Sequence, residues 1–255
     1  PLIVVEFWAQ GHNDSLAVLF LVLALAAASR QRWTGAFASL TLGALAKFWP
    51  VVLFPFFLLQ RREKRWIVHW KPALVAVPLA LAVSWPYWGG ISNVTELLKG
   101  FVGGWRNNDS LYGLIYQFVG DDFARSTTWV TRLLIAALAA LWALQLPLAK
   151  AAKWAVVLIL LFSANCFPWY LSWLVPLLAL YPGAPLLLWT ALVVLSYHIL
   201  IGYQALGVWE DSDQMRFLEY LPVYTMLGGV FVSRHAKQIW EATHRFAKRY
   251  SEPQA

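Results

Sequence analysis

The sequence predicts an all-α, polytopic integral membrane helix bundle with short broken helices and outer-face loops. Hydrophobic residues make up 60% of the chain and charged residues 13%, whereas soluble domains have about 45–50% and about 25%. Long apolar runs recur from one end of the chain to the other, as they do in multi-span proteins. The 16 tryptophans suit such a protein, because tryptophan and tyrosine collect at membrane–water interfaces.

Several of the apolar runs are shorter than the ~20 residues of a standard membrane span. Pro50 and Pro168 interrupt two of the short runs, and proline disfavours helix at the residue before it. We therefore expect two hairpins or re-entrant pairs, over 33–59 and 154–181, with tips at 47–50 and 165–170. The runs lie at 14–29, 33–46, 48–59, 72–88, 128–149, 154–168, 170–181, 185–201 and 221–233.

Charge predicts the topology, because cytoplasmic loops carry an excess of lysine and arginine. The basic clusters lie at 30–32, 61–65 with Lys71, 150–153 and 234–249. Placing them all inside gives the cytoplasmic face 14 of the 20 basic residues and 3 of the 13 acidic ones. The net charge of +7 then belongs to the inner face and its anionic lipids. We expect membrane lipids, and no nucleic acid, as partners of this basic surface.

No repeat or low-complexity linker divides the chain. We therefore treat 1–255 as a single membrane-embedded domain that ends in a basic cytoplasmic tail, 234–255. Two long segments, 89–127 and 202–220, are expected outside, and an amphipathic stretch at 94–106 could lie along the membrane surface. The single cysteine, Cys166, excludes an internal disulfide, and no metal-ligand spacing or nucleotide motif occurs. We expect no metal and no cofactor.

The sequence GHND, 11–14, stands directly before the first apolar run. Asn13 or Asp14 could cap the helix, and a carboxylate there gains about 0.3–1 kcal/mol from the helix dipole. Alternatively, His12, Asn13 and Asp14 line a water-facing cavity that binds a sugar or a phosphate.

Lys47 and Arg106 are candidate phosphate-binding residues. Ionisable residues at membrane depth are functional candidates by default, and arginine can bind phosphate through two parallel hydrogen bonds. The alternatives are that Lys47 snorkels to the interface and that Arg106 is a solvated loop charge. Asn108 and Asp109 could bind a ligand or cap a helix that starts near Ser110.

Trp169 and Tyr170 could be interfacial anchors or a stacking surface for a sugar ring. Asp211 and Asp213 have the spacing that holds a metal–nucleotide sugar, but no nucleotide sugar is expected on the outer side.

Four motifs, taken in order, give the chain a family resemblance. It resembles the polytopic glycosyltransferases of the C superfamily that use polyprenyl-phosphate sugars. Within them it is most similar to the bacterial α-mannosyltransferase-like group, which includes the α-1,2-mannosyltransferases of actinobacterial lipoglycan assembly. The motifs are VVEFWAQGHNDSL (4–16), ALAKFWPVVLFP (44–55), GWRNNDSLYGLI (104–115) and CFPWYLSWLVPLLA (166–179).

The resemblance implies an inverting transfer of one sugar, with mannose its commonest suggestion, on the outer face of a bacterial plasma membrane. The implied partners are a polyprenyl-phosphate-linked donor and a lipid-linked or cell-envelope glycan acceptor. The catalytic aspartate of this superfamily usually lies in the first outer loop, and we expect Pro1 to fall after that loop. The resemblance therefore implies an N-terminally truncated chain whose main base lies elsewhere, with Asp14 as the base if the chain is complete.

Our remaining assignments follow from this resemblance. The leaving phosphate would be stabilised by Lys47 and Arg106. Sugar and acceptor would be bound by His12, Asn13, Asn108, Asp109, Trp169 and Tyr170.

A transporter or flippase is the alternative function, because short broken helices also occur in transporters. Against it, the sequence has no visible inverted repeat, and its polar residues gather at outer loops and tips rather than at mid-span. A third class is a non-catalytic membrane scaffold, which would tolerate substitutions in the outer polar residues.

Overall fold

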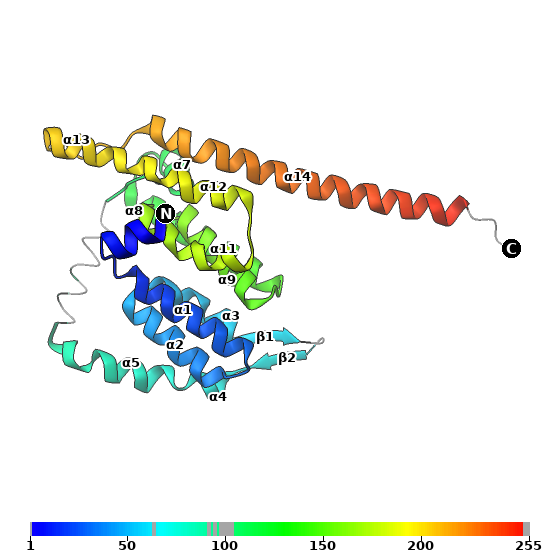
Figure 1. Ribbon diagram of the computed structural model, residues 1–255, viewed down its shortest axis with the longest axis horizontal. Helices are drawn as coiled ribbons and strands as arrows, with labels where there is room; N and C mark the ends of the chain where they lie inside the picture. Colours follow the sequence, from blue (N-terminus) through cyan, green and yellow to red (C-terminus); the bar gives the residue numbers. More distant parts are fainter. Residues whose placement is uncertain (1, 63–64, 91–92, 94–95, 97–104, 252–255) are drawn as a thin grey trace.

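The computed structural model describes residues 2–62, 65–90, 93, 96 and 105–251, with side chains as far as Ser233, except that of Arg62, and again at Ala236. It confirms the all-α membrane bundle: helices dominate, and one small hairpin is the sheet among the described residues (Figure 1). Within the described parts of the chain, three helices are long and apolar enough to cross a membrane, Trp70–Gly90, Phe123–Ala143 and Ala184–Leu206. The amphipathic stretch expected at 94–106 falls mostly outside the described residues.

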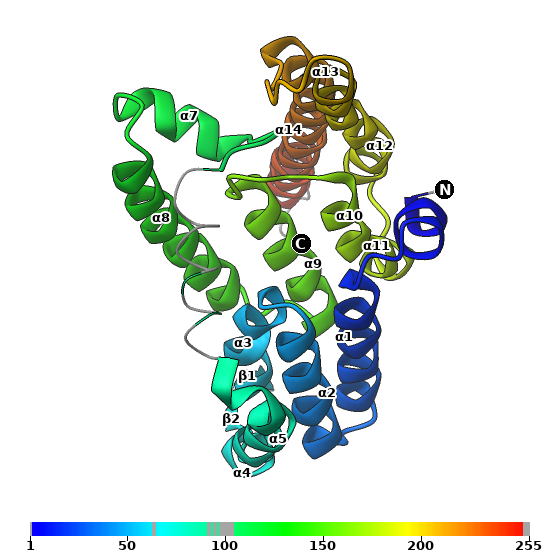
Figure 2. The same cartoon turned by 90° about the vertical axis from the view of Figure 1, so that its left-hand side faces the viewer.

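The helices α1 (Asp14–Ser29) and α2 (Trp33–Ala46) form a close antiparallel pair (Figure 2). They follow η1 (Val4–Ala9), a short π-helical segment. Small residues allow the two backbones to approach, as is common between membrane helices. A Cβ atom placed on Gly43 would lie 3.3 Å from the Cβ of Phe20. Because of this pairing, the start of α1 and the end of α2 lie at the same end of the bundle.

Both predicted proline breaks are confirmed. Lys47 is extended after α2, and the chain continues as η2 (Trp49–Leu53) and α3 (Phe54–Leu58). Phe167 is also extended, before α10 (Pro168–Leu171), η4 (Ser172–Leu174) and α11 (Val175–Leu180). In each case a proline occupies the first helical turn, where its missing N–H costs nothing.

The basic segment at 61–65 lies within a hairpin, 59–68, that we did not predict. β1 (Leu59–Arg62) pairs antiparallel with β2 (Arg65–Val68), with Leu59 opposite Val68. From the sequence we expected only a basic cytoplasmic connection here, because the consecutive charged residues show no alternation of apolar and polar positions that would indicate a strand. Pairing satisfies backbone groups that a loop would leave to water. The chain continues as α4 (Trp70–Ala73), α5 (Ala76–Ser84) and η3 (Trp85–Gly90).

The second half of the chain supplies the longest helices. The second predicted outer segment, 202–220, is largely helical, because the non-helical part between α13 and α14 covers only 207–212. Of the predicted tail, residues 234–251 continue α14 as helix. The helices are α7 (Leu111–Phe118), α8 (Phe123–Ala143), α9 (Leu148–Leu161), α12 (Ala184–Leu192), η5 (Val193–Tyr197), α13 (His198–Leu206) and α14 (Asp213–Ser251).

The bundle has two chemically different ends. The α1–α2 turn, the β1–β2 hairpin and the C-terminal part of α14 all lie toward the right of Figure 1. The α8–α9 turn joins them, because the backbone N–H of Arg61 donates to Oε1 of Gln145 over 2.8 Å. We call this the basic end. The opposite end, where α1 starts and α2 stops, holds the segments 6–14, 105–112, 163–173 and 207–219, and we call it the polar end.

Candidate functional site

A partly buried ion pair joins the two N-terminal helices at the polar end. Nζ of Lys47 lies 3.1 Å from Oδ2 of Asp14, whose side chain is fully buried. Oδ1 of Asp14 accepts a hydrogen bond of 2.7 Å from Nε1 of Trp173. Both carboxylate oxygens are therefore occupied. The Lys47 side chain keeps 31% of its surface exposed, and its Nζ also lies 5.7 Å from the centroid of the Tyr170 ring.

The predicted cap at Asn13 or Asp14 does not form. Asn13 occupies the N-cap position of α1 without a side-chain hydrogen bond, and Asp14 turns inward to Lys47. Gly11 has a φ of +67°, in the left-handed region that glycine tolerates. This turn folds the chain back on itself, so that the backbone N–H of His12 donates to the carbonyl oxygen of Glu6 over 3.1 Å. The GHND segment is therefore a junction between η1 and α1.

A second polar group surrounds Glu6, which is buried. The Tyr197 hydroxyl lies 2.8 and 2.9 Å from the two carboxylate oxygens of Glu6, and Nε2 of His12 lies 3.6 Å away. Burial raises the pKa of Glu6, although the Tyr197 hydrogen bond and the nearby His12 act in the opposite direction. The His12 ring stacks on Trp169 at 4.5 Å between centroids. His12 and Trp169 are thus in contact with each other at the polar end.

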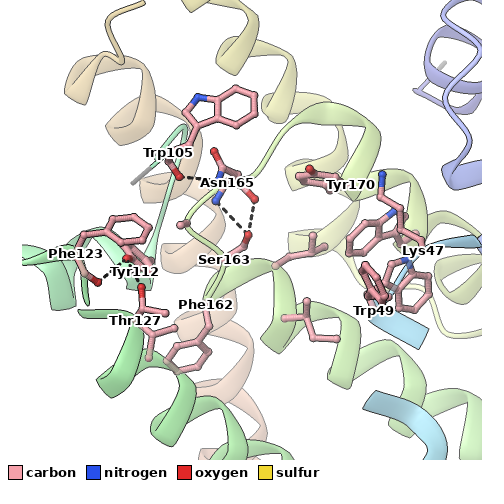
Figure 3. Close-up of a pocket in the computed structure, with 16 residues that line it drawn as sticks. Lys47, Trp49, Trp105, Tyr112, Phe123, Thr127, Phe162, Ser163, Asn165 and Tyr170 are labelled. Carbon is pink, nitrogen blue, oxygen red and sulfur yellow. Dashed lines mark hydrogen bonds between the residues drawn. The ribbon is translucent and has the colours of Figure 1, made fainter. Parts of the chain in front are cut away.

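A cavity of about 440 Å³ opens beside Lys47. Lys47, Trp49 and Tyr170 lie along one side of it, while Tyr112, Phe123 and Thr127 lie along the other, with Asn165 and Trp105 between (Figure 3). Aromatic and aliphatic side chains from α8, α9 and η4 complete the wall. Within the described part of the lining, Lys47 carries the one formal charge. Such a cavity suits a ligand that is largely apolar and carries an anionic group at one end.

Two polar atoms of the cavity wall lack hydrogen-bond partners among the described residues. They are Oδ1 of Asn165, an acceptor, and Nε1 of Trp49, a donor. The Asn165 side chain is oriented by its amide nitrogen, which donates to the Trp105 carbonyl over 2.8 Å. Buried polar groups are normally satisfied, so these two atoms are exceptions, and both are covered by neighbouring atoms rather than open to the cavity.

Arg106 has different surroundings from Lys47. Its Nε donates to Oδ2 of Asp109 over 2.5 Å, and its guanidinium stacks 3.8 Å from the centroid of the Tyr116 ring. Arg216 donates to the other oxygen of Asp109 and to Asp213, and its Nε lies 3.6 Å from Asp211. Burial acts to lower the pKa of Arg106, but the hydrogen bond and charge of Asp109 outweigh it, so the pKa rises. These two arginines and three aspartates form what we call the Arg106–Arg216 cluster.

Asn108 fastens the same segment to the bundle. Its amide donates to the carbonyl of Cys166 and, over 3.0 Å, to Oε2 of Glu219, while Oε1 of Glu219 accepts from Nε1 of Trp189. The φ of Asn108 is +51°, a conformation that asparagine tolerates better than most residues. Neither Asn108 nor Asp109 caps α7, which begins at Leu111 without a side-chain cap. Instead, the Asn108 side chain contacts Glu219 of α14 and the Asp109 side chain contacts Arg216 of α14.

The structure therefore separates the residues that we grouped by sequence. Lys47 and Tyr170 line the cavity, Asp14 lies behind Lys47, and His12 and Trp169 stack beside it. Arg106, Asn108 and Asp109 are held in the contacts between 105–112 and α14. Asp211 and Asp213 pair with Arg216, and no group of metal-binding residues occurs in the described ranges.

Sequence reasoning missed Trp173 and Glu219. Glu219 had a usable signal, because a lone carboxylate beside an apolar run is a candidate for a specific buried contact. Trp173 had none, since an interfacial tryptophan and a tryptophan bonded to a buried carboxylate look the same in sequence.

One comparison with known proteins bears on this site. Residues 1–63 match the family model of the alpha-(1->6)-mannopyranosyltransferase N-terminal domain. The matched part includes η1, α1, α2 and the Asp14–Lys47 pair. The match supports a membrane glycosyltransferase that resembles mannosyltransferases. The family name specifies an alpha-(1->6) linkage, whereas the resemblance that we noted in the sequence was to a group that includes α-1,2-mannosyltransferases. No curated protein and no solved structure matches the chain.

Proposed function

We propose that the chain is the membrane-embedded part of a mannosyltransferase. In this proposal it transfers mannose, with inversion, from a polyprenyl phosphate to a lipid-linked or cell-envelope glycan on the outer face of a bacterial plasma membrane. The family match over residues 1–63 supports the enzyme class. The single observation that carries the site assignment is the Lys47 side chain, which is partly exposed and lines a cavity whose other described lining residues are uncharged and mostly apolar or aromatic.

The cavity chemistry fits such a donor in two respects. Negative charge develops on the leaving phosphate as the sugar departs, and a fixed cation in a surrounding of low dielectric stabilises it. Lys47 supplies that cation. The sugar would lie against the Tyr170 ring, which lines the cavity together with Lys47.

Asp14 takes a different role in this proposal from the base that we first considered. Both of its oxygens accept hydrogen bonds and its side chain is fully buried, so it orients Lys47 rather than meeting the acceptor. The acceptor hydroxyl still needs a base. We assign that proton transfer to none of the described residues that line the cavity.

The test is a transfer assay in membranes that contain the product of the complete gene. Labelled polyprenyl-phosphate mannose is supplied, and incorporation into glycolipid is followed. Lys47→Met should lower transfer by about a hundredfold, the usual effect of removing one donor to a developing negative charge. Lys71→Met at the basic end removes the same charge from an exposed residue beside Trp70 and should leave transfer unchanged.

Equal transfer by wild type and Lys47→Met would overturn the site. Absence of transfer by the wild type, with uptake of the label into sealed vesicles instead, would overturn the enzyme class and support a transporter.

A further inference from the structure

Two hollows meet at the end of α8 that lies in the basic end of the bundle. The smaller one, of about 270 Å³, lies between β1 and the α8–α9 turn, and the larger one, of about 570 Å³, lies between the segment 51–59 and α8. They share the lining residues Phe56, Leu59 and Trp142. Among the described lining residues, none is common to these hollows and the Lys47 cavity. We call the two joined hollows the basic-end groove.

The larger hollow is apolar and opens at the side of the bundle. Two of its lining residues, Val51 and Ile135, are 52% and 62% exposed, on a surface that meets hydrocarbon in a membrane. On α8 the hollow extends from Ile135 to Trp142, a distance of about 10 Å at ~1.5 Å per residue. One leaflet of hydrocarbon is about 15 Å deep, half of the ~30 Å bilayer core. This part of the groove therefore suits one acyl chain of a single leaflet.

The smaller hollow has polar groups in its lining. Gln60, Arg61 and Gln145 contribute to it, and Arg61 carries the one formal charge among its described lining residues. Oε1 of Gln145 accepts from the backbone N–H of Arg61, and its Nε2 donates to the carbonyl of Trp142 over 2.7 Å. The protein itself therefore fixes the polar part of the groove directly beside the apolar part.

Trp142 marks the boundary between the two parts. Its Nε1 donates to the carbonyl of Leu59 over 3.1 Å, and its ring stacks on Trp66 at 5.4 Å between centroids. The Arg61 guanidinium lies 6.0 Å from the centroid of the Trp66 ring. Because tryptophan prefers the membrane–water interface, this stack places Arg61 at the level of lipid headgroups and the larger hollow at the level of acyl chains.

The charges of the basic end are not compensated within the described part of the chain. The ion pairs of the described residues all lie at the polar end, whereas Arg61, Arg65 and Lys71 are exposed at the basic end. Basic residues beside a cytoplasmic leaflet attract anionic lipids by about 1 kcal/mol each. A headgroup with a phosphate and no ammonium complements Arg61 better than a zwitterionic headgroup does.

We propose that the basic-end groove binds one anionic phospholipid of the cytoplasmic leaflet, with its phosphate at Arg61 and one acyl chain along α8 from Trp142 to Ile135. The occupant is a lipid of the surrounding membrane and is neither donor nor acceptor in sugar transfer. The groove lies at the opposite end of the bundle from the Lys47 ion pair, and its occupancy requires no transfer.

The experiment is photolabelling of the purified product of the complete gene in phosphatidylcholine nanodiscs. One probe is phosphatidylglycerol with a diazirine on one acyl chain, and the other is phosphatidylethanolamine with the same chain. Labelled peptides are identified by mass spectrometry. The phosphatidylglycerol probe should label the segments 51–59 and 135–142, and unlabelled phosphatidylglycerol should compete better than unlabelled phosphatidylethanolamine.

Arg61→Gln tests the headgroup contact. Labelling of these segments by the phosphatidylglycerol probe should fall about fivefold, which corresponds to ~1 kcal/mol for one basic residue, while labelling by the phosphatidylethanolamine probe should not change. The matched control is Arg65→Gln. Arg61 pairs with Trp66 across the hairpin, so its neighbour Arg65 lies on the other face, and its loss should change neither signal.

Ala139→Trp tests the apolar part, because it places an indole in the larger hollow. Labelling of 51–59 by both probes should fall about tenfold, as expected when two methylene groups lose their burial. Ala140→Trp, one position along α8 and outside the described lining, should change neither signal. If Ala139→Trp lowers the thermal unfolding temperature, Ile135→Trp repeats the test from another exposed position, with Ala136→Trp as its control.

Equal losses in Arg61→Gln and Arg65→Gln would overturn the proposal, because they would indicate attraction by overall positive charge. Equal competition by the two phospholipids would also overturn it, as would stronger competition by undecaprenyl phosphate. Selective labelling by a protein that transfers no sugar would overturn the proposed function and leave this lipid site in place. Sugar transfer that depends on Lys47, together with unselective labelling, would do the reverse.

Discussion

The Lys47 pair and the Arg106–Arg216 cluster lie at the same end of the bundle, yet they differ in how their charges are compensated. Lys47 has one carboxylate partner and a partly exposed side chain that lines a cavity. Arg106 and Arg216 share Asp109, and Arg216 has two further aspartates beside it. The cluster therefore offers a ligand little unsatisfied positive charge.

This difference explains why residue type alone is a weak guide to a phosphate site. Arginine is the better phosphate ligand in general, because its planar group donates two parallel hydrogen bonds. Here Arg216 donates to Asp109 and Asp213 and joins the segment 105–112 to α14, while Arg106 donates through Nε to Asp109 and stacks on the Tyr116 ring. We infer that the cluster stabilises the fold of the polar end and that Lys47 binds the ligand.

The strongest test of this comparison is Asp109→Ala. Without the shared carboxylate, the partly buried Arg106 and Arg216 lose a charge partner. Breaking a buried ion pair lowers the free energy of unfolding by about 3–5 kcal/mol. We expect the lower end of that range, because Arg216 keeps Asp213. Thermal unfolding in detergent should occur at a lower temperature, and transfer should fall in proportion to the folded fraction.

Asp213→Asn is the control for this variant, since the Asp213 side chain is 86% exposed and its ion pair should contribute little. A fully stable Asp109→Ala protein that has lost transfer would contradict our inference. It would favour the sugar- or acceptor-binding role that the sequence suggested for Asn108 and Asp109.

A smaller effect is expected from Asp14→Asn. The amide can still accept the hydrogen bond from Trp173, but Lys47 loses its charge partner and with it a fixed position. Misplacement of a catalytic group lowers turnover, and we expect kcat to fall about tenfold. The KM for the donor should not rise, because the ammonium is still present and one competing anion is gone. Steady-state kinetics at varied donor concentration would show this.

Lys47→Met provides the contrast, because it should raise the donor KM as well as lower kcat. If Asp14→Asn instead raised the KM as Lys47→Met does, Asp14 would contact the ligand itself, and its role as an orienting residue would be wrong.

The smallest effect concerns Glu6. Its raised pKa means that the folded protein binds this proton more tightly than the unfolded chain does. The contribution to stability is therefore favourable at pH values below the unfolded pKa and is lost as pH rises through the folded pKa. Glu6→Gln mimics the protonated form and should flatten this part of the stability–pH profile. The expected change in Tm is about 2–4 °C, which corresponds to ~1 kcal/mol in a chain of this size.

Thermal unfolding across the mildly acidic range measures this change, with Glu210→Gln, on the exposed loop before α14, as the control. A profile for Glu6→Gln that matches the wild type would show that Glu6 does not titrate in this range.

Much of the helical architecture could be predicted from the sequence, for reasons that are local. The apolar runs and the two prolines predicted the segments in which the helices break. At Pro168 the reason is local, because proline restricts the residue before it and Phe167 is extended. At Pro50 the extended residue is Lys47, three positions earlier, and Trp49 is already helical. The hairpin at 59–68 was missed, since its pairing is decided by the partner strand rather than by alternation within RREKR. The helical parts of the segment 202–220 were also missed, since α13 and α14 extend into it.

The candidate site was predictable only as a set of residues. The sequence by itself determined that Asp14, Lys47, Arg106 and Asp109 are polar groups beside apolar helices, since this follows from neighbours along the chain. Only the tertiary structure decided which of them pair, because 33 positions separate Lys47 from Asp14 and 107 separate Arg216 from Asp109. A charge is free for a ligand only when its partners do not satisfy it, and those partners come from distant parts of the fold.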